Sequence, residues 1–250
     1  MTVKDWDALA DDFSARVLEI SECDIDGVLQ ATAKRLGGAR KIATDFGCGA
    51  GALTRLISPY FKSVIGVDFA PKLIEAARAR TSAKNIEYDV CDLQAARAKR
   101  FPCDVAFCAN VLIGEDLPAR ERIARNVVAS LRKGGWAVFI VPSLEAVMRA
   151  YQVALNLRIS SGAEEAAAER ELDGWAADEV VSLPCGVIKM GGVQTKHFLE
   201  DEIAEFLTHL KLREVVVSRI SYPWREALPD APVKLRAAPP WDWMALGRKI

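Results

Sequence analysis

Short apolar runs alternate with amphipathic stretches in the first part of the chain, and this alternation predicts the fold. Helical spacing of apolar residues predicts helices over 52–60, 71–80 and 118–131. Between them, the apolar runs that read as buried strands are 42–46, 63–68, 86–91, 105–109 and 136–141. Continuous strands separated by helices are typical of a parallel sheet covered on both faces.

The pattern changes before and after this region. Residues 3–36 are predicted to be helical up to Gly37-Gly38, and two further helices are expected over 143–157 and 163–177. Residues 180–198 contain strand-like pieces broken by proline and glycine, and a helix over 200–210 follows. The last predicted strands, 215–220 and 241–247, are joined by a proline-rich connection without a helix, so we expect them to pair antiparallel.

Composition removes several function classes. The 250 residues are 51% hydrophobic and 27% charged, with a formal net charge of −1 and no dense Lys/Arg stripe. This mixture predicts a soluble globular protein without a nucleic-acid partner. The acidic start lacks the order of a signal peptide, and the longest apolar runs are too short to span a bilayer, so no membrane role is expected. Six cysteines without a CxxC pair and only two histidines argue against a metal site, and the cysteines are expected to be reduced, mostly buried thiols of a cytoplasmic protein.

The stretch Thr44–Gly51, TDFGCGAG, lies between the first predicted strand and its helix. Three glycines remove side chains that would keep a ligand off the backbone, and they permit positive φ. The helix behind them directs free N–H groups and a partial positive charge at the turn, which favours an anionic group there. Asp45 suits a cofactor that also carries a positive group.

This turn alone leaves two cofactors open. Residues 47–52 satisfy the loose G-x-G-x-x-A form of the dinucleotide fingerprint, and Asp68 lies about where that fingerprint needs an acid for the ribose. Taken singly, the motif fits NAD or S-adenosylmethionine.

Five segments in order resemble the motifs of the class I S-adenosylmethionine-dependent methyltransferases of small molecules. They are TDFGCGAG, VIGVDFAPKLIEAAR (64–78), IEYDVCDL (86–93), DVAFCANVL (104–112) and LRKGGWAVFIVPS (131–143). The resemblance covers roughly residues 40–143. It implies an α/β fold with a seven-stranded, mostly parallel Rossmann-like sheet, an antiparallel last strand, helices on both faces and an inserted cap after strand five. It also implies one methyltransferase domain, 1–250, with a helical lid (1–36), a cofactor-binding core (40–142), a substrate cap (143–198) and C-terminal strands (199–250).

The resemblance assigns cofactor roles that suit the chemistry of each residue. Asp45 takes the ammonium, Asp68 the ribose hydroxyls and Asp92 the adenine amino group, while the Leu93 N–H donates to the ring. Phe69 packs on adenine, Asn110 meets the methionine end, and the remaining cofactor-binding residues are those of the glycine turn: Gly47, Cys48, Gly49 and Gly51. Simpler roles stay open, namely a helix cap for Asp68, core packing for Phe69, and turns for Asp92 and Asn110. Cys48 is expected to be a small filler rather than a nucleophile.

Acceptor residues are expected outside this common core. By its chemistry His197 is the candidate general base, although a hydrogen-bonded loop histidine is the alternative. Glu115, with Asp116 beside it, would favour a cationic acceptor if it faces the pocket, or would stabilise a helix N-terminus. The other substrate candidates are Trp6, Phe13, Tyr151, Tyr222 and Arg225, for which core or surface roles compete.

The sequence therefore predicts an enzyme that transfers a methyl group from S-adenosyl-L-methionine to O or N of a small molecule, leaving S-adenosyl-L-homocysteine. In-line displacement of an activated methyl group needs positioning above all. A monomer or homodimer is expected. The alternatives are a non-catalytic cofactor-binding protein and a methyltransferase of proteins or peptides. An NAD-dependent oxidoreductase is disfavoured because nothing resembles a hydride-transfer site.

Overall fold

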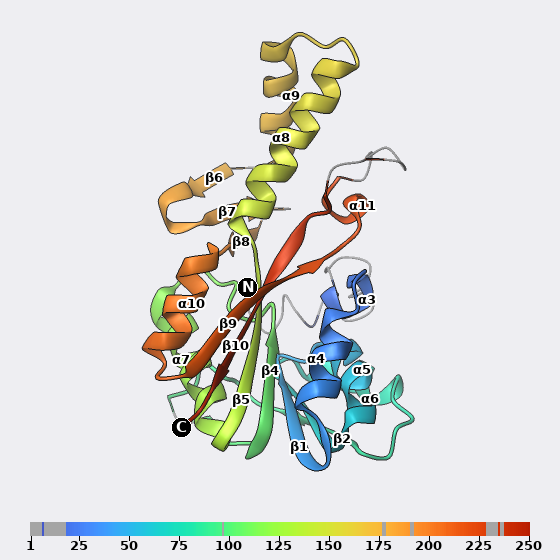
Figure 1. The fold of residues 1–250 in the computed structure, drawn as a ribbon, viewed down its shortest axis with the longest axis vertical. Helices are drawn as coiled ribbons and strands as arrows, with labels where there is room; N and C mark the ends of the chain where they lie inside the picture. The colour runs from blue at the N-terminus through green and yellow to red at the C-terminus, as the bar shows by residue number, and fades with distance from the viewer. Residues whose placement is uncertain are drawn as a thin grey trace.

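The computed structural model places a twisted sheet at the centre of the molecule, with helices on both sides and a helical hairpin projecting from one end (Figure 1). It describes residues 7, 19–96, 98–176, 179–190, 193–228, 235 and 238–250. Among these residues no helix is both long and apolar enough to cross a bilayer.

The main sheet has seven strands in the order β3-β2-β1-β4-β5-β10-β9. The first five strands pair parallel, whereas β10 pairs antiparallel with both β5 and β9. This confirms the predicted fold class. The strand bounds are β1 Gly38–Phe46, β2 Phe61–Asp68, β3 Ile86–Val90, β4 Cys103–Ala109, β5 Leu131–Pro142, β9 Arg213–Ser221 and β10 Trp241–Arg248.

Alternation along each strand buries both faces of the sheet. On β5, Val138 and Ile140 face the helices of one side, whereas Ala137 and Phe139 face the other. The first side is covered by α4 and α5, the second by α7 and α10, and α6 packs on β2 and β3. The helices of the described chain are α3 Ile20–Cys23, α4 Val28–Leu36, α5 Ala52–Ile57, η1 Ser58–Tyr60, α6 Pro71–Ala79, α7 Leu117–Ser130, α8 Leu144–Ser160, α9 Glu165–Ala176, η2 Leu183–Cys185, α10 Glu200–His209 and α11 Trp224–Ala227.

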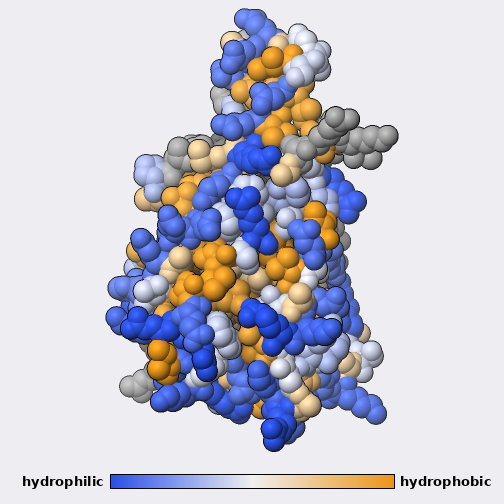
Figure 2. All heavy atoms as spheres, in the orientation of Figure 1, coloured by the Kyte–Doolittle hydropathy of each residue, from blue (hydrophilic) through white to orange (hydrophobic). Residues whose placement is uncertain are grey.

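The segment between β5 and α10 is built differently from the core. Helices α8 and α9 pack on each other as the projecting hairpin, and β6 Glu179–Ser182, β7 Val187–Met190 and β8 Val193–Lys196 form a separate antiparallel sheet. Figure 2 shows apolar residues gathered on the hairpin, where the side chains of Met148 and Ile159 are exposed.

Residues 20–36 do not form the continuous helix expected from the apolar spacing. The helix is broken between α3 and α4, where Gly27 adopts a left-handed conformation with φ 66°. Asp24 accepts a hydrogen bond at 2.8 Å from the backbone N–H of Leu29, in the first turn of α4. A turn of aspartate and glycine therefore outweighs the helical periodicity.

Two smaller expectations were also wrong. The connection between β9 and β10 was predicted to lack a helix, yet it contains the single turn α11. Strand β5 begins at Leu131 rather than 136, and its register with β4 is irregular before Trp136, where Gly134 and Gly135 lie. The antiparallel pairing that was inferred from this connection is nevertheless confirmed.

Gly66 on β2 offers a test of the packing beneath the glycine loop. A methyl group at Gly66 would lie 2.5 Å from the ring of Tyr88, which is held by a 2.9 Å hydrogen bond between its hydroxyl and Thr81. We expect Gly66→Ala to lower the free energy of unfolding by about 1–3 kcal/mol in urea titrations, because the core must shift to accept it. Gly38→Ala, whose methyl group meets only the Lys41 side chain at 3.6 Å, should change it by less than about 1 kcal/mol. Equal losses in the two variants would contradict this.

Candidate active site

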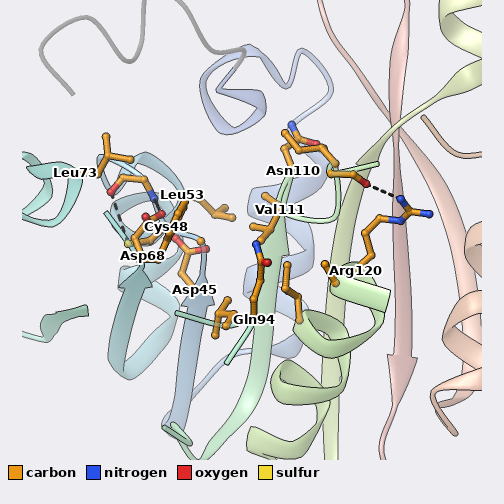
Figure 3. Close-up of a pocket in the computed structure, with 18 of the residues that line it drawn as sticks. Asp45, Cys48, Leu53, Asp68, Leu73, Gln94, Asn110, Val111 and Arg120 are labelled. Atoms are coloured by element: carbon orange, nitrogen blue, oxygen red, sulfur yellow. Dashed lines mark hydrogen bonds between the residues drawn. The ribbon is translucent and has the colours of Figure 1, made fainter. Parts of the chain in front are cut away.

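A cavity of about 430 Å³ opens at the carboxyl ends of β1, β2 and β4. This is the edge of the sheet where open α/β folds bind ligands, and the volume is in the range of small-molecule sites. Figure 3 shows Asp45, Cys48 and Asp68 on one side, Asn110 and Val111 in the middle, and Arg120 on the other side.

The loop after β1 lies directly against the neighbouring strand. The N–H groups of Gly47 and Cys48 both donate to the carbonyl of Val67, at 2.7 and 3.0 Å. Gly47 has φ 75°, and a methyl group on it would lie 2.2 Å from the side chain of Val111. Only glycine combines this backbone conformation with the close packing of Val111 against the loop.

Asp45 lies at the base of the cavity, 1% exposed, and accepts a 2.6 Å hydrogen bond from the Thr54 hydroxyl. Burial raises the pKa of its carboxyl to about 7; the Thr54 hydrogen bond offsets this only in part, and the nearby Asp68 carboxylate adds to it. Within the described residues, no cation pairs with Asp45.

Asp68, at the end of β2, lines the same cavity. Its two carboxyl oxygens accept hydrogen bonds from the backbone N–H groups of Gly49 and Ala70, both at 2.9 Å. The N-cap of α6 is Ala70, so Asp68 forms a turn before the helix rather than capping it directly. Burial raises the pKa of Asp68, and these N–H donors oppose the shift.

Most of the other predicted cofactor residues also line the cavity, namely Gly47, Cys48, Gly49, Phe69, Asp92, Leu93 and Asn110. Asp92 is exposed and accepts a 2.8 Å hydrogen bond from the N–H of Gln94, the turn role that the sequence had left open. Cys48 is buried, which raises the pKa of its thiol well above the usual range, so it is no nucleophile at neutral pH. Gly51 is outside the lining and is instead the N-cap residue of α5, with φ 81°.

Asn110 follows β4 with a positive φ of 54° and is joined to the far end of the chain. Its amide Nδ2 donates to Asp242 of β10 at 3.4 Å, while its Oδ1 is buried without a hydrogen-bond partner. Burial raises the pKa of Asp242 to about 7. Asn110 also lines the cavity, so this hydrogen bond connects β10 to the site.

His197 does not reach the cavity. It is 3% exposed, its Nδ1 lies 3.1 Å from the carbonyl oxygen of Thr195, and burial lowers the pKa of its imidazole to about 4. This is the hydrogen-bonded loop histidine of the alternative interpretation, and the position offers it no contact with a ligand in the cavity.

The acceptor candidates are only partly brought together. Glu115 lines the cavity, and so does Asp116, which caps α7 by accepting from the N–H of Ala119 at 3.1 Å. Tyr222 is buried in the core, and Arg225 is exposed beside Glu226. Tyr151 packs on the apolar cluster of the hairpin, Ala154, Leu172 and Leu228. Trp6 and Phe13 lie outside the described residues.

Sequence reasoning missed much of the rest of the lining, including Glu19, Arg120, Val193 and Gln194. Glu19 precedes α3, and burial together with repulsion from Glu22 raises the pKa of its carboxyl to about 7. Arg120 carried a signal that was overlooked, because it falls on the apolar face of α7 with Ile123, Ala124 and Val127. In the described part of the chain, no group of three or more His, Cys, Asp or Glu is placed to hold a metal.

Comparison with known proteins agrees with this geometry. Residues 43–135 match the model of a methyltransferase domain. A ubiquinone biosynthesis O-methyltransferase of Bordetella pertussis is 30% identical over 118 residues, which are 45% of this chain and 46% of the relative. The match thus spans about half the length of this curated relative.

Solved structures extend the likeness in fold to nearly the whole chain. The N-methyltransferase NodS from Bradyrhizobium japonicum, in complex with S-adenosyl-L-homocysteine, has a TM-score of 0.58 at 18% identity and covers 99% of this chain and 96% of its own. A chain of a complex that contains the Haloferax volcanii Trm112 methyltransferase activator has a TM-score of 0.61 at 14% identity, and the likeness covers 97% of this chain and 96% of that one. Residues 43–135 are thus similar to a methyltransferase domain, and the chain as a whole shares the fold of these solved structures.

The raised pKa of Asp45 predicts how the stability of the free protein depends on pH. Between about pH 4, where an unfolded Asp ionises, and about pH 7, the folded state holds a proton that the unfolded chain releases. The free energy of unfolding should therefore fall as pH rises through this window. Asp45→Asn, neutral at every pH, should show a smaller fall in urea titrations between pH 4 and 8.

Asp89 provides a control of opposite sign. Its pKa is lowered by the hydrogen bond from Lys99, so Asp89→Asn should remove stability that is present above pH 4. Parallel profiles for the wild type and Asp45→Asn would contradict the raised pKa of Asp45.

Proposed function

We propose that this protein binds S-adenosyl-L-methionine in the cavity and transfers its methyl group to a small-molecule acceptor. The observation that carries the proposal is the convergence of the glycine loop, Asp45 and Asp68 at one end of the cavity. The match of residues 43–135 to a methyltransferase domain supports it.

The residues present fit this cofactor. Asp45 is a buried carboxylate without a cationic partner in the described chain, and an ammonium group beside it would lower its pKa and favour its ionised form. Asp68 could accept from the two ribose hydroxyls after its bonds to the loop rearrange. Gly47 and Gly49 bring the backbone of the loop to the cavity, and Asn110 lines it as well.

The chain itself has a limited chemical task in this proposal. The bound cofactor supplies an activated methyl group on its sulfonium, and the protein needs to hold the acceptor in line with it. Positioning of this kind can contribute about 7–11 kcal/mol towards lowering a barrier. Where the acceptor carries a proton, the Glu19 carboxyl, with a pKa near 7, is better suited than His197 to remove it.

The acceptor side is proposed to be a small-molecule site because the cavity is walled by β8 of the segment after β5. Val193 and Gln194 of that strand line it together with Ile113 and Gly114. A protein acceptor would instead require an open groove. The relatives do not separate O- from N-methylation, since one is named an O-methyltransferase and another an N-methyltransferase.

Calorimetry with S-adenosyl-L-homocysteine tests the cofactor assignment. We expect the wild type to bind it, and Asp68→Ala to bind at least about tenfold more weakly, because charge-assisted hydrogen bonds to the ligand are lost. Asp89→Asn removes a carboxylate from the next strand, outside the cavity, and should bind like the wild type. No binding by the wild type, or equal binding by Asp68→Ala, would remove the assignment.

Turnover separates an enzyme from a protein that only binds the cofactor. Release of S-adenosyl-L-homocysteine from S-adenosyl-L-methionine should rise when phenols, amines or carboxylic acids are supplied as acceptors. Tight binding of S-adenosyl-L-methionine without product release for any of these acceptor classes would favour a non-catalytic cofactor-binding protein. Product release that requires added protein or peptide would favour a methyltransferase of proteins or peptides.

A further inference from the structure

Arg120 is a buried cation that lines the cavity, and not all of its N–H groups have a hydrogen-bond partner. Its side chain is 7% exposed, and its Nη1 donates to the carbonyl oxygens of Gly114 and Glu115 at 2.5 and 2.8 Å. Its Nε is buried without a partner. No carboxylate of the described chain forms an ion pair with it.

The surroundings of Arg120 compensate its buried charge only in part: burial lowers the pKa of its guanidinium, and the carboxylates of Glu202 and Asp116 oppose that shift. The carbonyl groups of Gly114 and Glu115 both accept from Nη1 of Arg120. A buried guanidinium usually pairs the N–H groups at its edge with a carboxylate or phosphate. Arg120 lies in the first turn of α7, where the helix dipole adds partial positive charge. The nearby Glu202 is held by Lys196 at 2.6 Å, and Asp116 is an exposed N-cap.

The position of Arg120 separates it from the acidic end of the site. Figure 3 shows Asn110 and Val111 between Asp45 and Arg120, so the buried guanidinium lies apart from the buried acids of the glycine-loop end. In the proposed function that acidic end is assigned to the ammonium of the cofactor. Arg120 lies beside Gly114, on the acceptor side, where the exposed residues Glu115 and Asp116 also line the cavity.

We propose that Arg120 binds an anionic oxygen group of the acceptor, and that the acceptor is therefore a small carboxylate-bearing molecule. This inference rests on the proposed function and specifies its substrate class. The guanidinium matches a carboxylate in shape and hydrogen-bonding geometry, and binding would give the buried charge the partner that the chain lacks.

A cationic acceptor held by Glu115 is the competing arrangement. Glu115 also lines the cavity, but it is exposed. Water screens an exposed carboxylate far more than a buried guanidinium. The buried group therefore dominates the selection of charge at this end.

Matched pairs of ligands test the proposal directly. With the protein saturated by S-adenosyl-L-homocysteine, calorimetry measures binding of benzoate, phenylacetate, 4-hydroxybenzoate and hexanoate, each against its primary amide and against benzylamine. We expect at least one acid to bind about tenfold or more tightly than its amide, because only the acid forms a charge-assisted pair with Arg120. Arg120→Gln should remove this preference, and Arg120→Lys should keep part of it.

Arg125 supplies the control on the same helix. It is 60% exposed and paired with Glu121, so Arg125→Gln should keep the full preference for acids. Equal binding of acids and amides, no binding of any acid, preference for benzylamine, or retention of the acid preference in Arg120→Gln would overturn the proposal. If Arg120→Gln does not fold, the wild-type preference and its reduction in Arg120→Lys decide the outcome.

Binding of S-adenosyl-L-homocysteine to the same samples separates the two levels of inference. If the wild type does not bind S-adenosyl-L-homocysteine, the proposed function is wrong. If the wild type binds it but does not prefer acids to amides, only the proposed role of Arg120 is wrong.

Discussion

The attachment of the loop after β1 to the end of β2 sets the geometry of the whole site. Gly47 and Cys48 donate to the carbonyl of Val67, and Gly49 donates to the carboxylate of Asp68. These bonds hold the chain reversal in place, so that α5 begins at the mouth of the cavity and Asp45 lies beneath it. The turn therefore positions both acids as well as removing side chains from the ligand's path.

This arrangement places negative groups where they are poorly solvated. The pKa values of Glu19, Asp45 and Asp68 are all raised, and burial is the largest cause in each case. A cationic ligand group would relieve this cost, as is common at sites where local stability is exchanged for binding. The same argument with opposite sign applies to Arg120 at the other end, where a buried cation lacks an anionic partner in the described chain.

The core and the segment after β5 contribute to the site in different ways. Strand ends of the core carry the residues proposed to hold the cofactor, and their position follows from the parallel sheet. The inserted segment contributes Val193 and Gln194 through β8, which is attached to the core by the hydrogen bond from Lys196 N–H to the carbonyl of Ile113 at 2.8 Å. The α8–α9 hairpin projects beyond this contact (Figure 1).

The sequence by itself determined the order of strands and helices, the glycine loop and the acids at the strand ends. These features depend on local periodicity and on chemistry within a few residues, and parallel topology then brings strand ends to one edge. The tertiary structure decided that His197 is buried away from the cavity, that Asn110 meets Asp242, and that Arg120 rather than Tyr222 or Arg225 faces the site. Each of these outcomes depends on packing between segments far apart in the chain, and a local pattern does not encode which distant side chains fill the space beside it.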